Sequence, residues 1–141
     1  MANLTVTADA VAICHRPETA EIWRGVAAEV ITPGQTVYQT SAGTWGVGAA
    51  GTNGKYQIRG IALNKAGAGQ AVEILIKGFV SGFNLSSLAY DAQVFASDTA
   101  GALADAAGTH SVAMGRVVAL SDVPSYSKVL YVHANWAAQI P

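Results

Sequence analysis

Short runs of alternating apolar and polar residues, separated by turn-forming residues, dominate the chain. The first run covers residues 3–8, and runs rich in β-branched and aromatic residues cover 36–40 and 71–77. Alternation with a period of two is typical of strands that bury one face. We therefore predict strands in these runs and in residues 29–31, 57–63, 93–97, 112–120 and 128–134.

Glycine and proline interrupt the chain so often that long helices have little room. There are 15 Gly and 4 Pro. Pro33-Gly34 suits the two central positions of a type II turn, and Asn53-Gly54 marks another turn. Residues 84–90 and 102–107 have weak helical propensity, and we expect a helical turn or an ordered loop in each.

A succession of turn, strand, hairpin, glycine-broken strand and closing strand occurs twice. Residues 32–38 align with residues 89–95, and Gly60 and Gly115 interrupt the next strand of each copy. Residues 72–76 and 128–132 then close the two units. Chance similarity between Ala-, Gly- and Val-rich segments is the alternative explanation. Because two such units bury their apolar faces against each other, we predict a mainly β, barrel- or sandwich-like (tulip-like) domain with at most short helical turns.

The length of 141 residues suits a single compact domain. We expect an N-terminal arm and first strand in residues 1–24, a β domain in residues 25–134, and a C-terminal tail in residues 135–141. The two repeat-like halves of the β domain would span about residues 29–78 and 86–134.

Charged residues are scarce. They make up 12% of the chain, about half of the usual ~25%. The net charge of -1 offers no basic excess for nucleic acid, and no apolar run reaches the ~18 residues of a membrane helix. The first positive side chain is Arg16, so the start lacks the basic region of a secretory signal and we expect cytosolic synthesis. A surface so poor in charge is hard to hydrate, so we expect other subunits to cover much of it.

No combination of reactive side chains predicts catalysis. Cys14 and His15 are neighbours, but neighbours on a strand point to opposite faces, and one cysteine cannot form an internal disulfide. Residues 46–51 fit G-x-G-x-x-G by letter, yet no helix follows them. The acidic residues are scattered singly, and the His and Cys residues lack the spacing of a zinc site. We expect a protein that is not an enzyme and holds no cofactor or metal.

Three tryptophans are the first candidate interface residues. Trp23 lies in the N-terminal segment, Trp45 in a Gly-rich loop, and Trp136 in the tail. An exposed tryptophan tends to cover a neighbouring surface, and tryptophan is enriched at the centres of subunit interfaces. Packing in the core is the alternative.

The N-terminal segment is the second candidate interface. It alternates like a strand, but no adjacent turn pairs it within its own domain. An unpaired strand seeks a free sheet edge. We therefore expect it to add to a sheet of a partner protein or of a neighbouring protomer through Asn3, Leu4, Thr5, Val6 and Thr7.

Four short motifs resemble the head decoration (cement) proteins of tailed bacteriophages. They are ITPGQTVY at 31–38, RGIALN at 59–64, AGQAVEI at 68–74, and MGRVVAL at 114–120. A G-x-x-V-Y strand, a G-I-A-L-N strand and a G-x-x-V-x-V closing strand recur in such proteins. The resemblance covers residues 25–134, with nothing recognisable in residues 1–24 or 135–141.

The resemblance implies a virion protein that sits on the outer surface of an icosahedral head. It would form a homotrimer, bind the major capsid protein and clamp adjacent capsid subunits, with no catalysis and no contact with nucleic acid or membrane. The candidate interface residues would then contact the capsid or a neighbouring protomer. The alternative is a carbohydrate- or cell-surface-binding β module, in which exposed Trp45 and Trp136 stack on sugar rings.

Overall fold

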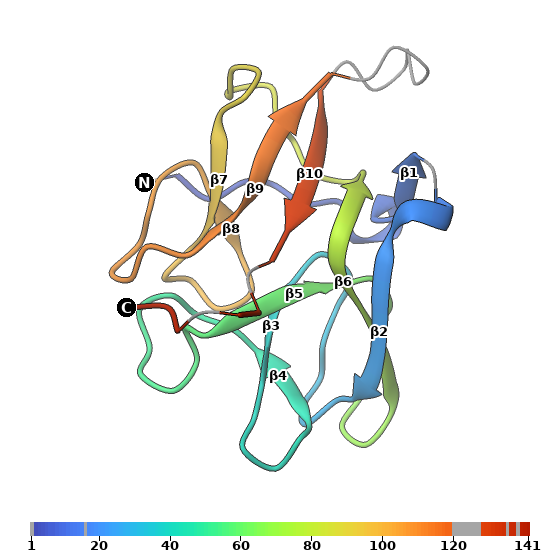
Figure 1. The fold of residues 1–141 in the computed structure, drawn as a ribbon. Helices are drawn as coiled ribbons and strands as arrows, with labels where there is room; N and C mark the ends of the chain where they lie inside the picture. Colours follow the sequence, from blue (N-terminus) through green and yellow to red (C-terminus); the bar gives the residue numbers. More distant parts are fainter. Residues whose placement is uncertain (1, 16, 120–127, 135, 138) are drawn as a thin grey trace.

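The computed structural model describes residues 2–15, 17–119, 128–134, 136–137 and 139–141 (Figure 1). Arg16 and Leu120, named above, lie outside these residues. In the described part, the mainly β fold is confirmed, and the only helical elements are two short 3-10 turns, η1 (Ala8–Ala10) and η2 (Pro17–Thr19). The strands are β1 (Ile13–His15), β2 (Glu21–Val26), β3 (Thr36–Gln39), β4 (Trp45–Val47), β5 (Ile58–Ala62), β6 (Ala71–Val80), β7 (Gln93–Ala96), β8 (Leu103–Ala104), β9 (Ala113–Val118) and β10 (Val129–His133).

These strands form one curled antiparallel sheet around β6. The main path runs β4-β3-β5-β6-β10-β9-β7-β8, and β1 and β2 also pair with β6. With ten residues, β6 is long enough to carry β5 and β10 on one edge and β2 and β1 on the other. It is the strand that connects the two ends of the molecule (Figure 1).

The two repeated units have the same strand order. In the first unit, β3 pairs with β4 and β5, and β5 pairs with β6. In the second unit, β7 pairs with β8 and β9, and β9 pairs with β10. Val37 lies opposite Gly60, Val94 lies opposite Gly115, and a shift of register follows both pairs. The sequence alignment of the units is therefore reproduced in the pairing.

The turn that leads into each unit is also the same. The Gln35 amide donates to Thr32 O at 3.2 Å, and the Ala92 amide donates to Ala89 O at 3.2 Å. Gly34 has φ 89°, as the predicted type II turn requires. Asp91 occupies the equivalent position with φ 67°, the only positive φ outside glycine in the described residues.

Glycine in the interrupted strands is explained by close backbone approach. A Cβ on Gly60 would lie 2.8 Å from the carbonyl oxygen of Leu75, and one on Gly115 would lie 1.9 Å from that of Tyr131. Any larger residue would push apart two paired strands in either unit.

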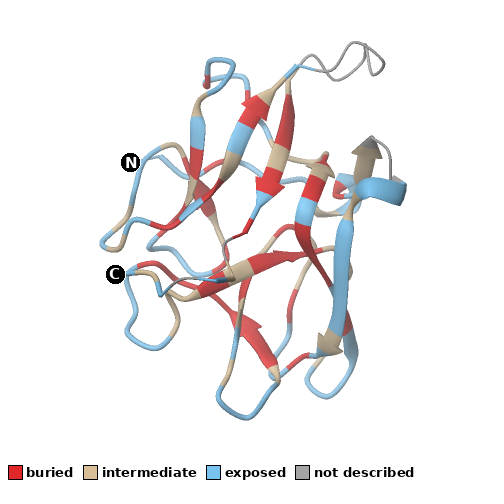
Figure 2. Ribbon diagram, in the orientation of Figure 1, coloured by how far each residue is buried: buried red, intermediate tan, exposed pale blue. Residues whose placement is uncertain are grey.

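The core has two clusters, and β6 contributes to both. Its residues Leu75 and Val80 belong to the larger cluster, which also contains Met114 and Leu130 of the second unit. Three other residues of β6, Val72, Ile74 and Ile76, belong to a smaller cluster. Figure 2 shows that buried residues concentrate along β5 and β6.

Several local elements differ from the prediction. Residues 29–31 form no strand and contribute only a bridge from Ile31 to Ala66. Residues 102–107 include the unexpected strand β8, which pairs with β7. Residues 84–90, in contrast, make a turn closed by the Leu88 amide and Leu85 O, in agreement with the expected turn or ordered loop. Strands β1, β2, β4 and β8 were not expected. Strands β1, β4 and β8 have only two or three residues, too few to show a period, and in β2 the adjacent apolar residues Ile22 and Trp23 interrupt the alternation.

The N-terminal arm is paired within its own domain. Asn3 bridges Ala104, and the Leu4 amide donates to Leu103 O at 2.8 Å. Val6 bridges Phe83, and the side chain of Leu4 is buried in the larger cluster. The expectation that residues 3–7 lack a partner in their own domain is therefore wrong. The partner edges come from distant parts of the chain, so inspection of adjacent turns could not reveal them.

Candidate functional site

The three tryptophans come together in one cluster. The ring centroids of Trp23 and Trp136 are 4.6 Å apart, and those of Trp136 and Trp45 are 5.7 Å apart. Trp45 is buried in the smaller core cluster, Trp136 packs against that cluster, and Trp23 is 39% exposed. We call these residues the tryptophan cluster; it runs from the interior to the surface.

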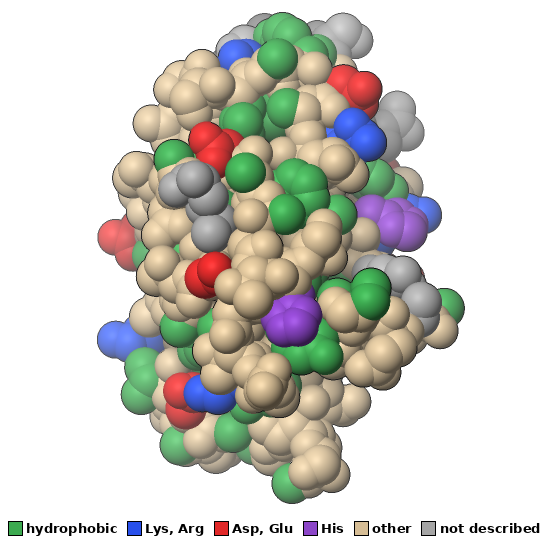
Figure 3. Space-filling view, turned by 90° about the vertical axis from the view of Figure 1, so that its left-hand side faces the viewer, with side chains coloured by type: hydrophobic (Ala, Val, Ile, Leu, Met, Phe, Trp, Pro, Cys, Tyr) green, Lys and Arg blue, Asp and Glu red, His purple; other side chains and the backbone are tan. Residues whose placement is uncertain are grey.

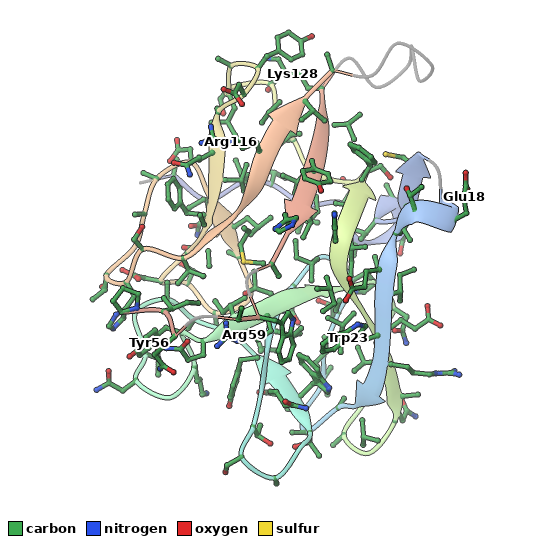
Figure 4. All side chains as sticks on the ribbon, in the orientation of Figure 1. Glu18, Trp23, Tyr56, Arg59, Arg116 and Lys128 are labelled. Carbon is green, nitrogen blue, oxygen red and sulfur yellow. The ribbon has the colours of Figure 1, made fainter. Side chains whose placement is uncertain are left out.

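The sequence around the cluster explains its geometry. A Cβ on Gly25 would lie 2.2 Å from Nε1 of Trp45, so glycine there lets the indole of Trp45 lie against β2. Trp136 donates from Nε1 to the carbonyl oxygen of Arg59 at 2.9 Å, and the Arg59 guanidinium lies 5.5 Å from the Trp136 ring. Figure 4 shows Trp23 on β2 and Arg59 on β5.

Only one tryptophan is therefore available to a partner as a largely exposed side chain. Trp45 is 3% exposed, so it packs in the core, as in the alternative to an interface role. Trp45 is the first residue of β4, and its ring packs in the smaller core cluster. Trp23 donates from Nε1 to the Glu21 carboxylate at 2.9 Å and presents the rest of its indole at the surface. An exposed indole with its N–H already satisfied is suited to apolar contact.

Strand β2, which carries Trp23, is exposed along almost its whole length. Five of its six residues are exposed, and Gly25 is intermediate. Ile22 is 40% and Val26 is 47% exposed, although both are large apolar residues. Figure 2 shows this strand in pale blue at the margin of the molecule, beside the buried part of β6.

The backbone of β2 has one paired edge and one free edge over most of its length. The Ala27 amide donates to Gln70 O at 2.8 Å, so the alternation of an antiparallel ladder directs Gly25 and Trp23 toward β6 as well. The N–H and C=O groups of Ile22 and Arg24 therefore point away from β6. No strand of the described chain pairs with them; only the end of β2 is covered, where Ala27 bridges Trp45.

The charges on β2 are matched on its paired side. Glu21 lies opposite Lys77, and Arg24 lies opposite Glu73. Opposite charges at facing positions favour the pairing of the two strands. The surface of β2 is thus apolar with two charges of opposite sign, and no net charge repels a partner. Charged side chains are also scattered on the other side of the molecule from β2, which Figure 3 shows.

A second surface of interest lies on β6, β9 and β10. The rings of Phe79 and Tyr131 are 5.0 Å apart, and those of Tyr131 and His133 are 6.2 Å apart. Tyr131 lines two open hollows of about 550 and 260 Å³, and the smaller one also includes Gln93 and Arg116. We call this the tyrosine face. Its aromatic rings, unlike the tryptophans, were not identified from the sequence, because their spacing along the chain gives no sign that they meet.

Reactive groups are few in the part of the chain that the structure describes. Burial raises the pKa of the Cys14 thiol, while a backbone hydrogen bond partly offsets the rise. Among the described residues, no group of three or more His, Cys, Asp and Glu could hold a metal ion. None of the described helical segments has the length and apolar character needed to cross a bilayer.

Comparison of the chain with protein-family models, with curated proteins and with solved structures found no match. The resemblance to phage decoration proteins therefore depends on the four short motifs alone. Of these, residues 31–38 form the turn and strand β3, residues 59–64 lie in and after β5, and residues 68–74 lead into β6.

Proposed function

We propose that this protein is a structural component of a tailed-phage virion. It binds the outside of the icosahedral head as a trimer and clamps adjacent major capsid subunits. The observation that supports this most is strand β2, which exposes Ile22, Trp23 and Val26 at a free sheet edge. An apolar edge of this kind marks a surface that another polypeptide covers.

Stabilisation of a shell needs no chemistry from the bound protein. A ligand that binds only the expanded lattice stabilises that lattice by mass action. A trimer engages several capsid subunits at once, so a modest contact by each copy suffices. In this mechanism Trp23 is the anchor, because its packing on the partly buried Trp136, which in turn contacts the buried Trp45, fixes the indole before binding.

Sedimentation of the purified protein tests the trimer. At micromolar concentration we expect a mass three times the 14.4 kDa of one chain. A monomer at that concentration would contradict the trimeric clamp and favour an independent binding module.

Binding to emptied, expanded phage heads tests the function itself. We expect the protein to occupy the heads and to raise their resistance to heat or chelation, and Trp23→Ala to reduce occupancy at least about tenfold. Tyr90→Ala is the matched control, because Tyr90 is a 52% exposed aromatic residue of the second unit. Equal occupancy by the Trp23→Ala and Tyr90→Ala variants would show that Trp23 is not part of the interface. If the unaltered protein does not occupy the heads, the proposed function is rejected.

The tyrosine face favours a second candidate, a saccharide-binding module. Neighbouring, tilted aromatic rings beside Gln93 and Arg116 provide an apolar surface with hydrogen-bonding groups. Titration with a panel of neutral and acidic oligosaccharides tests it. Binding that is lost in Tyr131→Ala and retained in Trp23→Ala would favour this function over the clamp.

A further inference from the structure

We propose that the free edge of β2 accepts an extended segment of a different polypeptide as an additional antiparallel strand. The segment has an acidic residue opposite Arg24, apolar residues opposite Trp23 and Ile22, and a basic residue opposite Glu21. The inference goes beyond the proposed function, because it defines how a partner binds and what chemistry it has. It does not require that the partner be a capsid protein.

The first argument is the hydrogen bonding of β2. Ile22 and Arg24 direct their N–H and C=O groups away from β6, as the ladder between β2 and β6 requires. The same alternation appears on β6, where Glu73 opposite Arg24 turns its C=O to the Leu63 amide at 2.8 Å. An added strand would meet two donors and two acceptors in line, which is the geometry of β-strand addition.

The second argument is the difference between the two faces of β2. Trp23 lies on the face of Ile74, which is buried in the smaller core cluster, and Ile22 lies on the opposite face. Trp23 packs on Trp136, which packs against the smaller cluster, and the indole of Trp23 remains 39% exposed. An apolar side chain opposite Trp23 would continue that cluster by one strand, and a second apolar side chain would pack beside Ile22.

A second copy of β2 fits this edge poorly. Two identical antiparallel strands related by a two-fold axis continue one sheet only if each face meets the same face of the copy. Arg24 shares its face with Ile22 and Val26, and Glu21 lies on the other face. Arg24 can thus never lie opposite Glu21 of the copy, and neither charge gains an opposite charge from the copy. A segment with an acidic residue three positions before a basic one matches both.

The N-terminal arm of the same chain does not provide this strand either. The Thr5 carbonyl accepts from the Asn84 amide at 2.9 Å, and the Thr7 amide donates to Gly82 O at 2.8 Å. The backbone of the arm is therefore occupied elsewhere in the fold. The arm is therefore excluded, and no other described strand pairs with this edge, so we infer an occupant from another polypeptide.

The test uses the whole protein and a synthetic peptide with blocked ends, Thr-Thr-Glu-Val-Val-Lys-Thr, followed by NMR. Antiparallel pairing places its Glu opposite Arg24, its two Val opposite Trp23 and Ile22, and its Lys opposite Glu21. We expect the amides of Ile22 and Arg24 to shift and to gain protection from exchange at peptide concentrations up to about 2 mM. Absence of shifts on β2, or shifts centred on another surface, would overturn the proposal.

Two N-methylated peptides provide matched controls. The N–H of the second Val, opposite Ile22, faces β2 in the proposed register, whereas the N–H of the first Val, opposite Trp23, faces away. We expect methylation of the second Val to weaken binding at least about tenfold and methylation of the first Val to leave it within about twofold. An equal effect of the two methyl groups would show that the peptide does not add as a strand.

Exchange of the Glu and Lys of the peptide tests the charge pattern. We expect the exchanged peptide to bind about threefold or more weakly to the unaltered protein, and Arg24→Glu to abolish that preference. A preference that survives in Arg24→Glu would overturn the proposed register. If the protein occupies the heads but no peptide adds to β2, the strand addition is rejected and the proposed function stands. If a peptide adds to β2 but the heads stay unoccupied, only the proposed function is rejected.

Discussion

Two N-terminal segments close the two units of the sheet in the same way but with opposite burial. Residues 2–15 run from β8 to β6, with a bridge from Asn3 to Ala104 and pairing of Ile13 with Val80. Residues 21–28 run from β6 to β4, with the ladder of β2 and a hydrogen bond from the Ala28 amide to Trp45 O at 2.7 Å. Each unit is thus completed by a strand-like segment from the start of the chain.

The difference between the segments shows where a partner can bind. Residues 2–15 bury Leu4 and Val11 in the larger cluster. Residues 21–28 bury only Ala27 and leave Ile22 and Val26 exposed. The first segment buries its apolar side chains and pairs its backbone within its own domain, whereas the second segment keeps exposed apolar side chains and a free edge. The docking edge that we propose therefore lies in the first unit, although both units have the same topology.

The largest expected effect comes from breaking the shared architecture itself. Gly115→Ala would place a Cβ 1.9 Å from Tyr131 O, between β9 and β10. We expect a loss of about 4 kcal/mol or more in the free energy of unfolding, or failure to fold. Gly67→Ala is the control, with no atom nearer than 3.4 Å. Denaturant unfolding measures both, and a Gly115→Ala protein of normal stability would contradict the close approach of the strands.

Truncation of one apolar residue in each closing segment tests the comparison directly. Leu4 is 9% exposed and Ile22 is 40% exposed. We expect Leu4→Ala to lower the free energy of unfolding by about 2–3 kcal/mol, and Ile22→Ala by less than about 1 kcal/mol. Thermal or denaturant unfolding distinguishes them. Equal losses of unfolding free energy in the two variants would mean that both segments contribute equally to the core.

The turn that opens each unit offers a smaller test. Gly34 and Asp91 are equivalent, but a Cβ on Gly34 would lie 2.7 Å from the side chain of Val6 in the N-terminal arm. We expect Gly34→Asp to cost about 2 kcal/mol. Asp91→Gly should remain within about 0.5 kcal/mol of the original stability, because glycine tolerates the positive φ and the ion pair with Arg116 is exposed. Similar costs for both changes would contradict the packing of the arm on the first unit.

The smallest effect concerns Cys14, in the closing segment of the second unit. Burial raises the pKa of its thiol, so the reactive thiolate fraction near pH 7 is below that of a free cysteine. We expect slow alkylation at neutral pH that accelerates as the pH rises through the shifted pKa. A stopped-flow or mass-spectrometric rate measurement against a cysteine peptide checks this. A rate equal to that of the peptide would mean that this part of the segment opens freely.

Much of the fold was predictable because its signals are local. Alternation identified the regions of β3, β5, β6, β7, β9 and β10, and Pro33-Gly34 identified the first turn. The repeat predicted the equivalence of Gly60 and Gly115, which the register confirms. These features depend on residues a few positions apart, so the period of the side chains and the chemistry of the turns are enough to define them.

The candidate site was only partly predictable, because it depends on which distant segments meet. The sequence identified Trp23, Trp45 and Trp136 by type, but their convergence and their different burial arise only when β2, β4 and the tail pack together. Residues 3–7 alternate like a strand but form only isolated bridges, whereas residues 21–26, which show no such pattern, form strand β2. The tertiary structure decided that the first would fill an edge of its own domain and the second would keep an edge free, since edge pairing is non-local and local patterns do not encode it.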